Sequence, residues 1–214
     1  MIIMGIDQSI TGTGVVIFDT DKDEVLHKRV ITPPTDIVKY AKEKEFESSE
    51  WMNLDVYKEG LIDLGGKNLI KVKDRTKAQK KLFKLNNETR FKYIIAELAE
   101  MLKNYNVERV GMEGIAFGGS GMTSTLSELL GYIKCLTLLF GVDHKTIIIT
   151  TVKKFATGKG NALKPAMMEA VEDKHKEFLF DDDILEKNED DISDAYHIAQ
   201  YISTLSDDEM RSLI

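Results

Sequence analysis

The sequence has a single cysteine and no long hydrophobic segment among its 214 residues. Cys135 therefore cannot form a disulfide within the chain, which indicates a reducing compartment. No apolar run approaches the length of a membrane span, and the N-terminus lacks the basic segment and the cleavage site of a signal peptide. We therefore expect a cytoplasmic protein that does not associate with a membrane.

The sequence also lacks the positive charge that is typical of proteins that coat a polyanion, since its net charge is −7. The charge is spread unevenly. Residues 64–92 hold ten Lys and Arg against two acids, whereas residues 169–214 hold fifteen acids against four bases. A metal-dependent nuclease needs both features, because phosphates are gripped at the side and metal is held at the centre. The alternative for the basic segment is a solvated helix face.

A hydrophobic content of 43% and a mass of 24.2 kDa suit one globular domain with a sizeable core. The order of apolar runs and helical patterns is typical of a mixed α/β sheet flanked by helices. We expect strands at residues 2–6, 15–18, 25–32, 107–112 and 146–150, and helices at residues 88–105, 123–140, 165–180 and about 191–203. Residues 35–87 carry the weakest signal. We therefore predict one domain over residues 1–214 with an insertion at about 35–87.

Four acidic residues stand where predicted strands end or a predicted helix begins. Asp7 follows the apolar run 2–6, and Glu113 follows the strand 107–112. Asp191 and Asp194 are three residues apart at a helix start, so they share one face of its first turn. Asp7 alone would be read as an ordinary turn residue. Together, the four carboxylates form a set of hard oxygen ligands for divalent cations, as two-metal cleavage of a phosphodiester requires.

These motifs resemble those of the RuvC-type Holliday junction resolvases, and most of all a phage member. The resemblance covers residues 1–34 and about 88–204, and it includes Gly5-Ile6-Asp7-x-Ser9-x-Thr11-Gly12-Thr13-Gly14, Met112-Glu113 and Asp191-x-x-Asp194-Ala195. It implies an RNase H-like fold with a mixed five-stranded sheet. It further implies a Mg²⁺-dependent endonuclease of DNA recombination and repair, which cuts four-way junctions as a homodimer in the cytoplasm of a bacterial host. The family's metal-binding acids fall on Asp7, Glu113, Asp191 and Asp194, which would hold two Mg²⁺ ions, with Mn²⁺ as a substitute.

The resemblance also places basic residues at the site, on Lys153 and Lys164. We interpret residues 151–163 as a mobile basic loop that delivers Lys164 to the scissile phosphate, where an ammonium group stabilises transition-state charge. The alternative is an ordinary join between helices. The aromatic residue that follows the family's second acid is displaced by one position, from Ala116 to Phe117. Further candidates for DNA contact, besides Phe117 and Lys153, are Lys154, Lys159, Lys77, Lys80, Lys81 and Lys84.

Other functions stay open on the sequence alone. A nuclease of the same fold that acts more broadly on flaps and forks would need the same residues. Actin-like ATP-binding kinases also open with Gly-Ile-Asp and a Thr/Gly turn, but they need two such halves, and this chain carries one set of these motifs. A non-catalytic junction-binding module is the third alternative, and the presence of all four carboxylates disfavours it.

Some residues are better explained by packing than by chemistry. Gly131 lies inside the helix 123–140, where it costs about 1 kcal/mol relative to Ala, so we expect close packing at that position. Cys135 should fill the core. We expect His197 to be a partly buried hydrogen-bonding residue rather than a metal ligand. The acidic residues 181–183 should be solvated.

Overall fold

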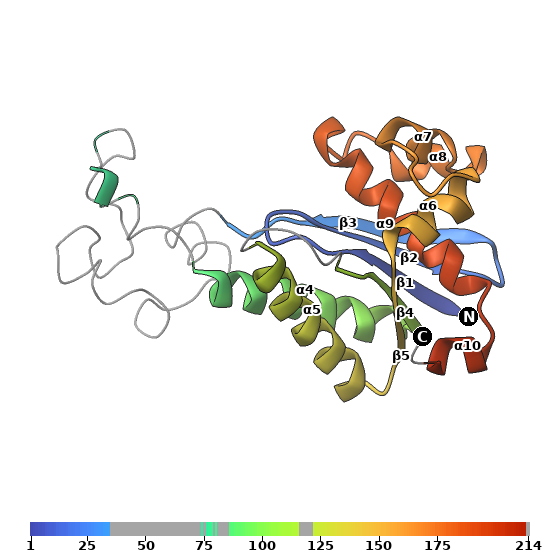
Figure 1. Cartoon of the computed structure of the whole chain (residues 1–214), viewed down its shortest axis with the longest axis horizontal. Coiled ribbons are helices and arrows are strands. Elements are labelled where there is room, and N and C mark those ends of the chain that lie inside the picture. Colours follow the sequence, from blue (N-terminus) through green and yellow to red (C-terminus); the bar gives the residue numbers. More distant parts are fainter. Residues whose placement is uncertain (35–73, 75, 79, 81–85, 116–121, 213–214) are drawn as a thin grey trace. The chain divides into compact units, whose positions relative to one another are not determined.

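The structure is a computed structural model of the chain, and it describes residues 1–34, 74, 76–78, 80, 86–115 and 122–212 (Figure 1). Contacts divide the chain into one unit of residues 1–32 and 91–214 and another of residues 33–90. Most of the predicted insertion lies outside the described residues, as do Lys81, Lys84 and Phe117. The single domain with an insertion at about 35–87 therefore stays a prediction. The fold described below is that of the first unit.

A mixed sheet of five strands forms the centre of this unit, as the sequence predicts. The strand order is β3-β2-β1-β4-β5. The first three strands form an antiparallel meander, while β4 and β5 run parallel to β1. The bounds are β1 (Ile2–Asp7), β2 (Thr13–Asp19), β3 (Glu24–Ile31), β4 (Arg109–Glu113) and β5 (Asp143–Ile147).

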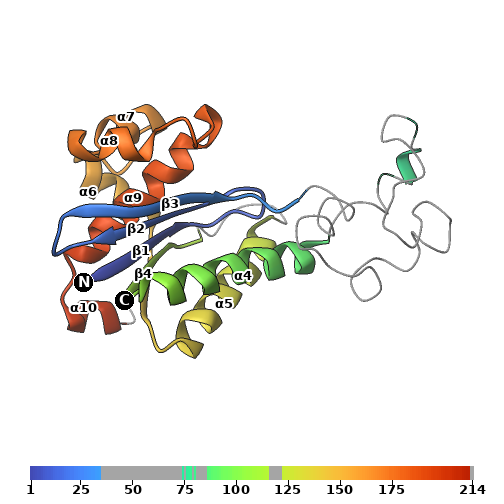
Figure 2. The same ribbon diagram turned by 180° about the vertical axis from the view of Figure 1, so that it is seen from behind.

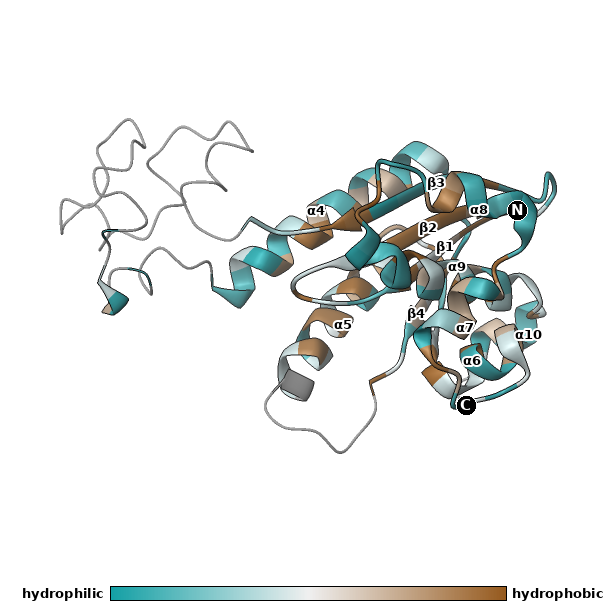
Figure 3. Ribbon diagram, turned by 90° about the horizontal axis from the view of Figure 1, so that it is seen from above, coloured by the Kyte–Doolittle hydropathy of each residue, from teal (hydrophilic) through white to brown (hydrophobic). Residues whose placement is uncertain are grey.

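Helices cover both faces of the sheet, as the two opposite views show (Figures 1 and 2). Met4 and Ile6 of β1 belong to the apolar cluster under α4 and α5, whereas Ile3 belongs to the cluster under α9. This alternation follows from the two-residue period of a strand. Because both faces are covered, β1 and β2 carry continuous apolar runs, visible as brown ribbon in Figure 3. The covering helices are α4 (Asn87–Tyr105), α5 (Met122–Leu139), α6 (Ile149–Thr157), α7 (Lys164–Glu169), α8 (Asp173–Leu179) and α9 (Glu189–Ser203).

The segment around β5 differs from the prediction. We expected a strand at residues 146–150, but β5 occupies residues 143–147 and α6 begins at Ile149. Pairing with β4 explains the shift, because the last residue of β4, Glu113, pairs with Ile147, the last residue of β5. The next residues form a helix that buries Val152 completely. The predicted loop over residues 151–163 was therefore wrong for its first half.

The predicted helix over residues 165–180 is two shorter helices. Pro165 lies in the first turn of α7, as expected, but α7 ends at Glu169 and α8 starts at Asp173. The break allows an irregular stretch to bury Val171 between the two helices. A 3-10 turn, η2 (Glu186–Asn188), then leads into α9.

A last short helix, α10 (Asp207–Arg211), was not predicted from the sequence. It starts with a capping box in which Ser206 and Glu209 exchange side-chain and backbone hydrogen bonds. Within the described part of the chain, no helix has both the length and the apolar character needed to cross a membrane.

The outer face of α5 corrects two expectations. No atom of the described residues lies within 4 Å of a Cβ placed on Gly131, so the predicted close packing is absent there. Cys135 is exposed and does not fill the core. Both residues face away from the sheet, because α5 buries the other side of the helix, with Leu129, Leu130, Ile133 and Leu136.

Candidate active site

Two of the predicted acids end neighbouring parallel strands. Asp7 is the last residue of β1 and Glu113 is the last residue of β4. Since Ile6 pairs with Met112, the next residue of each strand lies at the same edge of the sheet. The side chains of Asp7 and Glu113 share a hydrogen bond. Strand pairing therefore brings together two carboxyl groups that are more than a hundred residues apart in sequence.

Three glycines of the sheet allow α9 to lie directly on it. A Cβ on Gly14 would lie 2.7 Å from the carbonyl carbon of Asp191, and a Cβ on Gly5 would lie 2.7 Å from the backbone nitrogen of Ala199. On Gly111 it would lie 2.7 Å from Cγ2 of Ile198. These glycines belong to β2, β1 and β4, the three adjacent strands that α9 crosses. Because these residues have no side chain, the first turn of α9 can pack directly against the end of β1.

The first two turns of α9 place the other two acids beside Asp7: Asp191 lies in the first turn, and Asp194 lies in the second rather than in the first turn as predicted, because α9 already begins at Glu189. Burial of its carboxyl group raises the pKa of Asp7 well above the ordinary value, and the hydrogen bond that its protonated form donates to Glu113 and the charges of Glu113, Asp194 and Asp191 raise it further. Burial, followed by the charge of Glu113, raises the pKa of Asp194 to about 6. Burial also raises the pKa of Asp191. The charges of the other three acids thus act on Asp7, so the four acids form one electrostatically coupled cluster, and their role as metal ligands stays a prediction.

The loop between β1 and β2 borders this cluster. Thr13 donates a hydrogen bond from Oγ1 to the carbonyl oxygen of Ser9 at 2.5 Å, and the hydroxyl groups of Ser9 and Thr11 lie 3.2 Å apart. A Cβ on Gly12 would lie 3.5 Å from Oδ2 of Asp191. The Ser-x-Thr-Gly-Thr-Gly motif therefore builds a tight hydroxyl-rich loop at the edge of the carboxylate cluster.

The donor set of the cluster fits a hard divalent cation. The neighbouring acids raise the pKa values of Asp7 and Asp194, so these carboxyl groups would gain from a cation, which binds carboxylate oxygens and offsets their repulsion. In the described part of the chain, no three His, Cys, Asp or Glu side chains already surround a single point as a closed metal site.

Two lysines face the cluster from the helices beside α9. The positive charges of Lys153 on α6 and Lys164 on α7 both lower the pKa of Asp194, against the larger effect of burial. Lys164 also lowers the pKa of Asp191, and its Nζ forms an ion pair with Asp190. Two of the predicted basic residues therefore lie within electrostatic reach of the acids.

The other predicted DNA-contacting residues are exposed where the structure describes them, and Lys81, Lys84 and Phe117 are outside the described residues. Lys154 on α6 and Lys159 beyond its end are exposed. Lys77 and Lys80 are exposed residues of the second unit. Their contact with DNA stays a prediction.

The hydrogen-bonding role predicted for His197 is confirmed. The residue is buried, and its Nε2 donates to the carbonyl oxygen of Met167 on α7 at 2.8 Å. Burial lowers the pKa of His197, so the ring is neutral near pH 7 and suits this donor role. His197 therefore fastens α7 to α9.

Comparison with known proteins supports the fold. No protein-family model matches the chain, and no curated protein matches it at the level of sequence. Solved structures do match: Thermus thermophilus RuvC has a TM-score of 0.56 and 16% identity, over 93% of this chain and 91% of that one. The chain has the RuvC fold. The same bacterial protein in complex with a Holliday junction substrate gives a TM-score of 0.56 and 18% identity, over 93% and 90% of the two chains.

A eukaryotic protein shares this RuvC fold as well. The yeast mitochondrial Holliday junction resolvase Ydc2 matches with a TM-score of 0.50 and 10% identity, over 92% of this chain and 76% of that one. The RNase H-like architecture that the motifs imply is therefore present, although fewer than one residue in five is identical.

Sequence reasoning missed two features of the site. The glycines at 5, 14 and 111 were a usable signal, since glycine inside a strand often marks a close approach of another backbone. Asp190 gave no usable signal, because it stands in an acidic run in which most side chains are solvated. Only the structure shows its pairing with Lys164.

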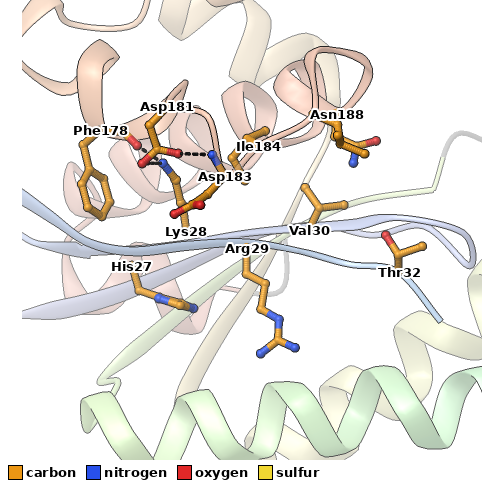
Figure 4. A pocket seen from close by; sticks show the side chains of 11 residues that line it. His27, Lys28, Arg29, Val30, Thr32, Phe178, Asp181, Asp183, Ile184 and Asn188 are labelled. Atoms are coloured by element: carbon orange, nitrogen blue, oxygen red, sulfur yellow. Dashed lines mark hydrogen bonds and ion pairs between the residues drawn. The ribbon is translucent and has the colours of Figure 1, made fainter. Parts of the chain in front are cut away.

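A cavity of about 490 Å³ lies between β3 and residues 178–188 (Figure 4). Lys28 links β3 to the opposite side of this cavity. Its Nζ donates a hydrogen bond to the carbonyl oxygen of Phe178 and forms an ion pair with Oδ2 of Asp181 at 2.5 Å. The same atom lies 4.7 Å from the centre of the Phe178 ring. The hydrogen bond from Lys28 lowers the pKa of Asp181. The prediction that residues 181–183 are simply solvated was therefore wrong for Asp181.

Proposed function

We propose that the protein is a metal-dependent endonuclease that cleaves branched DNA, above all four-way Holliday junctions, by two-metal hydrolysis of a phosphodiester. The observation that carries the proposal is the coupled cluster of Asp7, Glu113, Asp191 and Asp194 at one edge of the sheet. The fold supports it, because matching structures are Holliday junction resolvases and one holds a Holliday junction substrate.

The proposed site divides the work between carboxylates and lysines. Asp7 and Glu113 from adjacent strands, with Asp191 and Asp194 from α9, would hold two Mg²⁺ ions, or Mn²⁺ in their place. When bound, such a pair of ions supplies an activated water and stabilises the leaving oxygen. The carboxylates bind metal in their ionised form, so metal binding would compete with the protonation of Asp7 and Asp194, whose pKa values burial raises.

Lys164 and Lys153 would act on the substrate phosphate. Negative charge gathers on the phosphoryl oxygens as water attacks, and an ammonium group within reach stabilises that charge more in the transition state than in the ground state. Lys164 stands at the first position of α7. Because a catalytic contact of this kind contributes a factor on the order of 10² or more, Lys164→Ala should lower the single-turnover rate by that scale with little loss of affinity.

A homodimer is part of the proposal, and the outer face of α5 supports it. Tyr132, Leu138 and Leu139 are exposed by 46%, 69% and 80%, and they follow helical spacing with Gly131 and Cys135. An exposed apolar stripe along one face of a helix is a surface against which a second helix can pack. Two copies related by a two-fold axis would present two acid clusters to a symmetric four-way junction.

Cleavage of a set of labelled DNA substrates tests the proposed function. The protein is incubated with Mg²⁺ and with four-way, three-way, flap and linear duplex DNA, and the cut positions are mapped. We expect paired cuts in the two opposing strands of the four-way junction and little cutting of the linear duplex. Equal cutting of flaps and forks would favour the broader nuclease, and no cutting of any branched substrate would contradict the proposal.

A further inference from the structure

The starting observation is the ion pair between Lys164 and Asp190. The side chain of Lys164 is 68% exposed, while that of Asp190 is 18% exposed. Asp190 lies in the first turn of α9, directly before Asp191. A long exposed lysine chain samples many rotamers, whereas a short aspartate on a packed helix samples few. The ion pair therefore links the flexible side chain of Lys164 to an aspartate whose position is fixed by its helix.

The helix that carries Lys164 is itself anchored to α9. The side chain of Met167 is buried, and its carbonyl oxygen accepts the hydrogen bond of His197 at 2.8 Å. Asp190, Asp194 and His197 stand at positions i, i+4 and i+7 of α9, so they share the face that meets α7. One face of α9 thus holds the backbone of α7, the ammonium group of Lys164 and one of the cluster's carboxylates.

The geometry leaves Lys164 able to act on a phosphate while it is paired. An ammonium group has three N–H donors, so one can stay on Asp190 while another points toward a substrate oxygen. The charge of Lys164 already reaches Asp191 and Asp194. A lysine held in this way loses less conformational freedom when the reaction begins than a free lysine does.

We propose that Asp190 is a positioning residue that holds Lys164 toward the acid cluster. This inference rests on the proposed function, in which Lys164 stabilises charge on the scissile phosphate. Asp190 would act through Lys164 and would not bind metal. The variant Asp190→Asn keeps the shape of the side chain and removes its charge, while Asp190→Glu keeps the charge.

The ion pair can be tested without cleavage, by the reaction of lysines with an acetylating reagent followed by mass spectrometry. In the wild-type protein, Lys164 should react more slowly than Lys154, an exposed lysine of α6. Asp190→Asn should raise the reactivity of Lys164 by about threefold, a scale within the range of a partly exposed ion pair. The exposed-acid variant Glu186→Gln removes one nearby charge and should leave the ratio unchanged. An unchanged ratio in Asp190→Asn would overturn the proposal.

Single-turnover cleavage of a four-way junction in Mg²⁺ tests the consequence. Asp190→Asn should lower the rate by about fivefold, the upper end for such a pair, and Asp190→Glu should restore most of it. In a Lys164→Ala background, Asp190→Asn should have no further effect. The Mg²⁺ concentration for half-maximal rate and the junction affinity should not change.

Three results would contradict the positioning role of Asp190 in an active enzyme. The first is that Asp190→Asn lowers the rate equally in the Lys164→Ala background. The second is that Asp190→Asn raises the Mg²⁺ requirement, which would make Asp190 a metal ligand. The third is that Asp190→Asn cuts faster than the wild-type protein, which would mean that the ion pair restrains Lys164 from acting. A wild-type protein that cuts no junction would instead overturn the proposed function, together with the catalytic part of this inference.

Discussion

Single residues of the acid cluster work against the stability of the metal-free fold. A carboxyl group whose pKa is higher in the folded protein than in the unfolded chain costs free energy whenever it is ionised. For Asp194, the rise from 3.8 to about 6 corresponds to a cost on the order of 3 kcal/mol at neutral pH. Such a cost is expected where function needs like charges side by side.

Removal of one of these charges should therefore stabilise the metal-free protein. We predict that Asp194→Asn raises the melting temperature in EDTA at pH 7.5 by several degrees, since 1 kcal/mol corresponds to about 2–4 °C in a chain of this size. Differential scanning calorimetry measures the change. Asp183→Asn, at an exposed acid outside the cluster, is the matched control and should have little effect. A lower melting temperature for Asp194→Asn would contradict the repulsion inferred here.

The same residue predicts a pH dependence. Its folded-state pKa of about 6 lies above the ordinary value of 3.8, so the folded protein binds the proton more tightly than the unfolded chain does. Stability without metal should thus decline as the pH rises from about 4 to about 6. In the proposed site Mg²⁺ would bind the ionised carboxylates, so it should raise the melting temperature more at pH 8 than at pH 5. An equal Mg²⁺ effect at both pH values would count against a carboxylate site.

At the scale of elements, the contact between α9 and the sheet decides where the acids lie. Glycine at position 14 leaves room for the backbone of α9 at Asp191. We predict that Gly14→Ala destabilises the fold by about 2 kcal/mol or more and lowers the cleavage rate, because α9 must shift. Gly131→Ala is the matched control: its site is open, and alanine favours the helix by about 1 kcal/mol. Denaturant unfolding measures the stability of both variants. An unchanged stability in Gly14→Ala would contradict the close approach of α9 to Gly14.

How far the elements could be predicted depends on whether their signals are local. The five-stranded sheet, α4, α5 and α9 could be predicted, because their apolar patterns are long and regular. The end of β5 could not, since it is set by pairing with Glu113 of a distant strand. Nor could the break between α7 and α8, which serves the burial of Val171. Both depend on tertiary contacts.

The candidate site also combines features with a signal in the sequence and features that depend on tertiary contacts. That the four acids and the two facing lysines lie near one another could be predicted, because the chemistry and the family resemblance select their residue types, while their roles stay predictions. Two contacts that hold the site together could not be predicted, because each joins residues on different helices. They are the ion pair between Asp190 and Lys164 and the hydrogen bond from His197 to Met167. The sequence shows which groups are present, and the fold determines which of them meet.

At the scale of the whole molecule, the exposed apolar stripe of α5 predicts self-association. Leu138→Glu should shift the molar mass measured by light scattering from that of a dimer to that of a monomer, because a buried charge without a partner opposes the interface. Leu185→Glu is the matched control, since Leu185 is exposed by 60% but lies away from α5. A wild-type monomer at every concentration, or equal effects of both variants, would contradict the dimer.

The most direct test of the central claim compares junction binding with junction cleavage in two variants, each of which changes one acid of the cluster. Glu113→Gln and Asp7→Asn keep the size of the side chains, and neither should weaken binding of a four-way junction measured in Ca²⁺ by much. In Mg²⁺, the wild-type protein should cut the junction, while each variant should lose cleavage almost completely, because in the proposed function these carboxylates hold the metal and the basic residues hold the DNA. Near wild-type turnover in either variant would show that the cluster is not the catalytic metal site.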